Sequence, residues 1–177
     1  TAGRYVTSHS NTAVGAYALR NYNGGSQSTN GNNSAFGRDS MRDITTGNAN
    51  AAFGNASLRD VATGSANAAF GYGALQTCAG QYNTGVGRLV GTGLTTGNRN
   101  TILGAWFSGS QLTTGSNNTL LGYNATPTST TVSNEITLGD ANVTKFRIPG
   151  IGITFTDDTV IIPAPIDANG DLTVQGN

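Results

Sequence analysis

Few side chains in this 177-residue sequence could do chemistry. His9 is the only histidine and Cys78 the only cysteine, so His-based catalysis or a zinc site has little material, and no intramolecular disulfide can form. Cys78 stands where other repeats carry Thr, and we interpret it as a small buried filler rather than a nucleophile. The sequence therefore predicts no catalytic residues, no metal site, no cofactor and no enzymatic activity.

Carboxylates raise two further possibilities. Asp43 and Asp60 could serve as acid and base in glycan hydrolysis. Each directly follows an arginine, however, and each lies six residues after a repeated glycine, so we interpret them as a surface ladder of Arg–Asp pairs on neighbouring coils. Asp167, Asn169 and Asp171 alternate as calcium ligands do, but their glycine comes too early for a calcium-binding loop and no glutamate follows, which favours a turn.

Aromatic and threonine side chains could bind other surfaces. Aromatic residues follow several of the repeated glycines, and exposed rings can stack on sugar faces or simply pack on the outside of a fold. Trp106 and Tyr123 are the candidates for glycan contact. Ice binding needs a regular threonine array, and the array breaks because Thr45-Thr46 is followed in the next repeats by Ala62-Thr63 and Cys78-Ala79.

The composition narrows the class of protein. The chain holds 26 Gly, 26 Thr and 20 Asn, charged residues are 10%, and the formal net charge is zero. Disordered chains normally carry high net charge, and nucleic-acid binders carry a basic surface, so neither class fits. No apolar run approaches the length needed to cross a bilayer. No signal peptide is visible and the sequence begins at Thr1, so we expect a processed chain or a fragment.

A short apolar word repeats along the chain. It has the form Asn, small residue, apolar residue, larger apolar residue, Gly, and its closing glycines are Gly15, Gly37, Gly54, Gly71, Gly87, Gly104, Gly122 and, in a looser copy starting at Asn134, Gly139. The intervals are 22, 17, 17, 16, 17, 18 and 17 residues. A fixed period of this length indicates a repeat architecture.

Each repeat predicts one rung of a solenoid. A second glycine lies seven residues before most closing glycines, as at Gly47 and Gly64, and we expect it to supply positive φ for a tight turn, with similar geometry at the Asn of the word. Two glycines per repeat exclude helix. We expect a turn, a short strand, the glycine bend and a second short strand holding Leu58 or Leu75. Residues 1–139 thus predict an all-β solenoid or β-roll of about eight coils, with residues 21–28 as a loop.

Both faces of the repeated strand are apolar. The place before the closing glycine forms the expected core, which is Val14, Phe36, Phe53, Phe70, Val86, Leu103 and Leu121. Adjacent strand residues point to opposite faces, so the preceding place lies outside, and it holds Ala13, Ala35, Ala52, Ala69, Gly85, Ile102 and Leu120. We predict that this second column is buried in a parallel homotrimer, where Ala and Gly allow close approach and Ile102 and Leu120 fill a wider axis. The alternative is a monomeric solenoid with a mildly apolar flank.

These repeats resemble a known group of proteins. The stretches TTGNANAAFG, TTGNRNTILG and TTGSNNTLLGYNA resemble repeats in tail and neck fibres of tailed bacteriophages, and SNEITLGDANVTKFRIPG, residues 133–150, resembles the segment that closes them. The heads of trimeric autotransporter adhesins are a more distant likeness. The resemblance covers about residues 10–150 and implies a trimeric, elongated, extracellular fibre that attaches a particle to a host-cell surface. The implied partners are copies of the chain, other fibre or virion proteins, and a glycan or protein receptor, without nucleic acid or membrane insertion.

The texture changes after the repeats. Residues 143–148, 151–155 and 160–162 predict strands, and residues 166–172 centre an Asn-Gly hairpin turn. Residues 140–177 would then cap the last rung or join subunits into a filament. Two functions follow from the sequence. The first is a non-enzymatic viral fibre segment, a spacer and host-attachment module located in the virion tail or neck. The second is a subunit of a bacterial or viral extracellular filament or adhesin whose polymerisation is the function.

Overall fold

The chain forms an all-β structure. The computed structural model describes residues 10–20, 31–148, 153–156 and 160–161, and no helix lies within these residues. The described residues therefore hold no helix long and apolar enough to span a membrane. The strands of the first sheet are β1 (Thr12–Val14), β2 (Ser34–Phe36), β3 (Ala51–Phe53), β4 (Ala68–Phe70), β5 (Thr84–Val86), β6 (Thr101–Ala105), β7 (Thr119–Tyr123) and β8 (Ile136–Leu138).

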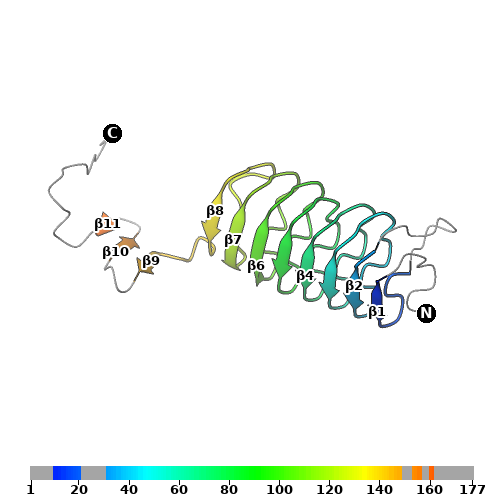
Figure 1. Ribbon diagram of the computed structural model, residues 1–177. Helices are drawn as coiled ribbons and strands as arrows, with labels where there is room; N and C mark the ends of the chain where they lie inside the picture. Colours follow the sequence, from blue (N-terminus) through cyan, green and yellow to red (C-terminus); the bar gives the residue numbers. More distant parts are fainter. Residues whose placement is uncertain (1–9, 21–30, 149–152, 157–159, 162–177) are drawn as a thin grey trace. The chain divides into compact units, whose positions relative to one another are not determined.

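These eight strands form one parallel sheet in chain order, β1 to β8. The repeated words lie in register: Ala35 is opposite Ala52, and Phe36 is opposite Phe53. Figure 1 shows the strands side by side with all arrows in the same direction, each joined to the next by a winding loop. The repeat region is a parallel β-solenoid of about six turns. The solenoid was predicted correctly, but the count of about eight coils was wrong.

The two apolar columns lie on the opposite faces from those predicted. Ala35, Ala52, Ala69, Ile102 and Leu120 are fully buried inside their own chain, Gly85 is buried with them, and Ala13 packs partly buried against this core. The column expected in the core is outside: Val14, Phe53, Phe70 and Leu103 are exposed, and Phe36, Val86 and Leu121 are half-buried. The alanine column therefore cannot be an interface between chains.

The reason for this exchange is the width of the coil. After each closing glycine the chain turns back and places a large residue inside, namely Leu19, Met41, Leu58 or Leu75. A methyl group added at Gly85 would come within 2.6 Å of Cγ of Leu75, so only a small strand residue fits opposite a leucine. Where the strand residue is Ile102, the returning residue becomes Gly109, whose added methyl would lie 2.7 Å from Cδ1 of Ile102. Large and small residues thus alternate sides within one coil.

The return segment is a series of turns rather than the expected second strand. Leu58 and Leu75 lie in turns and have φ of 47° and 49°. The residues two places after the closing glycine also have positive φ, as at Ala56 with 57°. This alternation swings every second side chain of the return segment into the core. Each inward leucine therefore comes from an irregular segment, which periodicity of two residues does not describe.

The second glycine of each repeat has a packing role that differs from the prediction. Gly47 and Gly64 do not have positive φ. A methyl group at Gly47 would lie 2.1 Å from the carbonyl oxygen of Gly64, and the same close approach recurs between Gly80 and Gly97 at 1.9 Å. These glycines are required because the backbone of one coil rests directly on the next.

The asparagines of the repeat form a buried ladder. Oδ1 of Asn50 accepts hydrogen bonds from the backbone N–H and from Nδ2 of Asn67, at 2.9 and 3.2 Å, and Nδ2 of Asn67 also donates to the carbonyl of Gly80 at 2.9 Å. The same contacts recur along the column Asn33, Asn50, Asn67, Asn83, Asn100 and Asn118. Positive φ lies at the residue before each asparagine instead, as at Ala49 and Ala66. The ladder joins every coil to its neighbours.

A second unit follows the solenoid. The chain divides into Thr1–Asp140 and Ala141–Asn177, close to the expected division after residue 139. The second unit holds an antiparallel sheet in the order β11 (Val160–Ile161), β10 (Ile153–Thr156), β9 (Lys145–Ile148). Strands were predicted at these places with slightly longer bounds. The expected loop at residues 21–28, the hairpin turn at 166–172 with the possible calcium ligands in it, and His9 lie outside the described residues.

Candidate functional site

The outer face of the eight-stranded sheet is the largest regular surface of the solenoid. Two columns of side chains cover it. The first column is the first residue of each strand, which is Thr12, Ser34, Ala51, Ala68, Thr84, Thr101, Thr119 and Ile136; the second is Val14, Phe36, Phe53, Phe70, Val86, Leu103, Leu121 and Leu138. We call these sixteen positions the outer face. None of them carries an ionisable side chain, so the face is neutral along its whole length.

Large apolar groups of the outer face are open to solvent. Leu103 is 50% exposed, Phe70 is 40% exposed and Ile136 is 73% exposed. The rings of Phe36, Phe53 and Phe70 stack in a row, with centroids 4.7 and 4.9 Å apart and ring planes within 6° of parallel. A contiguous apolar surface of this kind indicates a binding face.

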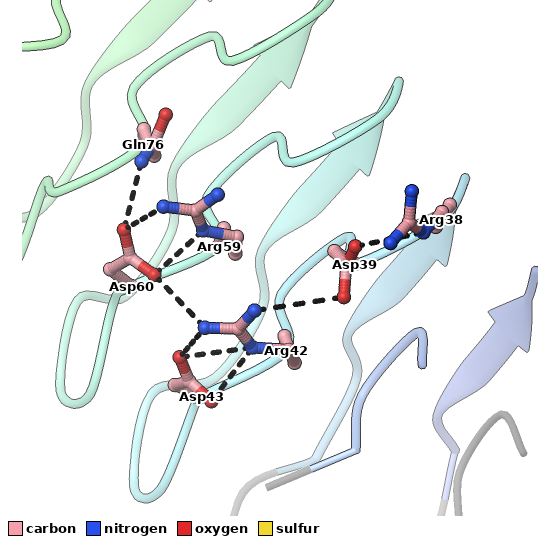
Figure 2. Close-up of polar contacts among 7 residues, drawn as sticks. All are labelled: Arg38, Asp39, Arg42, Asp43, Arg59, Asp60 and Gln76. Carbon is pink, nitrogen blue, oxygen red and sulfur yellow. Dashed lines mark hydrogen bonds and ion pairs between the residues drawn. The ribbon is translucent and has the colours of Figure 1, made fainter. Parts of the chain in front are cut away.

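A network of ion pairs lies on the turns beside the first coils. It comprises Arg38, Asp39, Arg42, Asp43, Arg59, Asp60 and Gln76. Figure 2 shows Arg42 linking two coils, because its Nη2 lies 2.8 Å from Oδ2 of Asp43 and 3.5 Å from Oδ1 of Asp60. Arg59 pairs with Asp60 at 2.8 Å. The predicted ladder of Arg–Asp pairs is confirmed.

The electrostatics of this network oppose hydrolytic chemistry. The hydrogen bond from Arg59 holds the pKa of Asp60 below its ordinary value, and the amide of Gln76 lowers it further. The hydrogen bond to Asp43 raises the pKa of Arg42 in the same way. A glycosidase needs one carboxyl group whose pKa is raised so that it carries a proton near neutrality. The geometry instead keeps Asp60 ionised and paired.

Aromatic side chains and one arginine gather on the later coils. Trp106 and Tyr123, the two residues expected to contact glycans, are 51% and 60% exposed and lie on adjacent strands or their ends. The guanidinium carbon of Arg88 lies 5.0 Å from the ring centroid of Trp106 and 5.7 Å from that of Tyr72. Phe107 meets Trp106 edge-on, with centroids 6.0 Å apart and planes at 79°. We call these five residues the aromatic patch.

The backbone explains why these rings point outward. Ser108 takes the buried place that Val90 holds one coil earlier, since each carbonyl accepts the same cross-coil hydrogen bond. Phe107 is therefore the extra residue of the 18-residue interval. Trp106 and Phe107 both have positive φ, 56° and 67°, which is uncommon for bulky residues. The insertion places two neighbouring aromatic rings on the surface.

Sequence reasoning missed Arg88 and Tyr72. Both directly follow a closing glycine, at equivalent places in adjacent coils. A further signal was present: residues 61–134 contain no Asp, Glu or Lys, and their only charged residues are Arg88 and Arg99. Arginines of the earlier coils pair with aspartates, whereas Arg88 and Arg99 lie over the rings of tyrosine and tryptophan. The solenoid thus divides into an ion-paired part and a part with two positive charges.

The described residues offer no group of three or more His, Cys, Asp or Glu side chains that could hold a metal ion. Cys78 is fully buried, as predicted for a filler. It occupies the apolar column of Ile44, Val61, Leu94 and Leu112, rather than a threonine position, because the 16-residue interval is one residue shorter after it.

The solenoid and its surfaces are the basis for any functional assignment. Comparison of the chain with protein-family models, with curated proteins and with solved structures finds no match.

Proposed function

We propose that this chain is a non-enzymatic fibre segment that associates with two further copies of itself along the outer face. In this proposal the trimer is a rigid spacer and host-attachment module of a viral tail or neck fibre. The single observation that supports it best is the neutral, solvent-exposed apolar face that runs over all eight strands. The likeness of the repeats to phage fibre repeats supports the viral location.

A second copy of the chain fits this face for a geometric reason. Stacked strands recur at a spacing of about 4.8 Å, and the phenylalanine rings follow this spacing at 4.7 and 4.9 Å. A partner keeps its side chains in phase with such a surface over eight strands only if it has the same rise per coil. A parallel copy of the chain meets this condition.

The chemistry of the two columns also fits self-association. Exposed Val, Phe and Leu side chains gain about 25 cal/mol for each Å² of apolar surface removed from water, and no charge needs to be desolvated. Small residues such as Ala51 and Ala68 adjoin the phenylalanines in the first column, so the large side chains of one copy have room beside the small ones of another. The interface thus uses the phenylalanine column, in place of the alanine column assigned from the sequence.

Light scattering of the purified chain tests this proposal. We expect a mass near 54 kDa, which is three times 18.0 kDa. Phe53→Glu places a charge on the outer face and should shift the mass toward 18 kDa, because charge burial is costly. Asn55→Glu adds the same charge two residues later at an exposed place outside the two columns, and should leave the mass unchanged.

Two results would contradict the proposal. A monodisperse wild-type mass near 18 kDa means that the outer face does not join copies of the chain. Indefinite fibrils in electron micrographs, instead of rods of fixed length, mean that polymerisation is the function.

A further inference from the structure

We propose that the aromatic patch is a binding site for acidic saccharides, with Arg88 contacting the carboxylate and the rings of Tyr72, Trp106 and Tyr123 contacting the sugar faces. The inference deepens the proposed attachment function and rests on it, because it names the class of ligand that such a fibre would contact.

The position of Arg88 is the first reason. Its guanidinium is held between two rings, at 5.7 Å from Tyr72 and 5.0 Å from Trp106. It makes no ion pair with the residues that the structure describes, in contrast to Arg42 and Arg59. Stacking on a ring orients a guanidinium without using its N–H donors. Those donors are therefore available to a ligand, in a plane fixed by the rings.

The charge of the surrounding surface is the second reason. The coils from residue 61 to residue 134 contain two arginines and no acidic side chain, which gives two positive charges and no compensating negative one. A carboxylate approaching Arg88 meets no repulsion from these coils. Arginine and carboxylate can form two parallel hydrogen bonds, which fixes the direction of the ligand as well as its charge.

The exposed rings are the third reason. Tyr72 is 52% exposed, Trp106 51% and Tyr123 60%. A pyranose presents an apolar C–H face that packs on an aromatic ring, while its hydroxyl groups stay in water. A polysaccharide with a carboxylate on its sugar units offers both partners at once. Rings on successive coils would contact successive parts of one chain.

Single-stranded nucleic acid also combines rings with negative charge, but it fits less well. Its phosphates recur at every nucleotide and call for a groove lined with many cations. The patch holds one arginine, and the net charge of the whole chain is zero.

Tryptophan fluorescence gives a direct readout, because Trp106 is the only tryptophan of the chain. The full-length protein is titrated with two acidic probes, oligogalacturonate and oligosialate, and with the methyl ester of oligogalacturonate, which has the same rings without charge. We expect a saturable change in Trp106 fluorescence with at least one acidic probe and about tenfold weaker binding, or less, of its uncharged counterpart. Oligothymidylate is the comparison for nucleic acid.

Two variants separate local contact from general attraction. Arg88→Gln should weaken binding of the acidic probe by about tenfold or more. Arg99→Gln removes the same charge from a ring on Tyr82, 5.9 Å away from its guanidinium carbon, and should change binding less than about twofold. The proposal is overturned if neither acidic probe changes the fluorescence, if the two variants weaken binding equally, or if oligothymidylate binds more tightly than both saccharides. The same samples are measured by light scattering: a trimer that binds no saccharide overturns this site alone, whereas a monomer overturns the proposed function.

Discussion

The Oδ1 atom of Asn50 accepts two hydrogen bonds from Asn67, one from its backbone N–H at 2.9 Å and one from its side-chain amide at 3.2 Å. This relationship makes the amide ladder a structural element of its own, since each buried asparagine satisfies polar groups on the coils before and after it. Unpaired polar groups are costly in a core, so every rung depends on its neighbours.

Replacing one rung should destabilise the whole solenoid. Asn67→Ala leaves the carbonyl of Gly80 and the backbone N–H of Asn83 without their side-chain partners. We expect the free energy of unfolding to fall by about 2–4 kcal/mol, because more than one buried group loses its partner. The measurement is urea denaturation at fixed protein concentration.

Asn55→Ala is the matched control for this prediction. Asn55 is exposed and lies outside the ladder, so its replacement should change the free energy of unfolding by less than about 0.5 kcal/mol. Equal effects of the two replacements would mean that the ladder contributes nothing special.

The exchange of large and small residues predicts strong coupling between Gly109 and Ile102. Gly109→Ala places a methyl group 2.7 Å from Cδ1 of Ile102 at a residue with φ of 66°. We expect a loss of about 1–3 kcal/mol from overpacking. Ile102→Ala alone should cost about 2–5 kcal/mol by leaving a cavity.

The double variant tests whether the two residues share one space. If the methyl group added at position 109 occupies part of the cavity left at position 102, the two costs should sum to at least about 1 kcal/mol more than the loss in the double variant. Denaturant titration of the four proteins gives this coupling energy, and simple additivity would contradict the packing described above.

The architecture was predictable from the glycines because their spacing follows the length of one coil. Alternation along a strand also showed that Ala52 and Phe53 lie on opposite faces. It could not show which face is inside, because both columns are apolar. The decisive signal lay elsewhere: the return segment changes from Leu75 to Gly91 and Gly109 as the strand changes from Ala69 to Ile102. Reciprocal sizes place both columns in one interior.

Surface features were predictable to different degrees. The pairing of Arg42 and Arg59 with aspartates follows from their adjacency in the sequence and the fixed period. The contact of Arg88 with Tyr72 and Trp106 needed the alignment of places after the closing glycine. The inserted Phe107 shifts that alignment by one residue, and only the coordinates show which residue is the extra one.

The network around Asp60 predicts a dependence of stability on pH. The hydrogen bond from Arg59 lowers the pKa of Asp60 in the folded state. A group with a lowered folded pKa stabilises the protein above its unfolded pKa, and this contribution is lost as the pH falls through the folded value. Wild type should therefore exceed Asp60→Asn in stability at pH 7, by less than about 1 kcal/mol because the pair is partly exposed.

The difference between wild type and Asp60→Asn should shrink between about pH 4 and pH 2, as the carboxylate takes up a proton. It should also shrink in 1 M NaCl, because salt screens partly exposed charges. Thermal unfolding at several pH values checks both. A difference that stays constant across this range would mean that Asp60 acts through packing alone.

Cys78 gives a probe of how tightly the coils stay closed. Burial raises the pKa of its thiol from 9.0 to about 11, so at pH 8 the thiolate is about 100-fold less abundant than for an ordinary thiol. Because the thiolate is the reactive form, and the side chain has no contact with solvent, we expect iodoacetamide to label the native protein at least about 100-fold more slowly than the urea-unfolded protein. Mass spectrometry over time measures both rates. Asn83→Ala removes a hydrogen bond to Sγ at 3.2 Å together with a rung of the ladder, and should speed native labelling by opening the coil. Fast labelling of the native wild type would contradict a closed interior at this column.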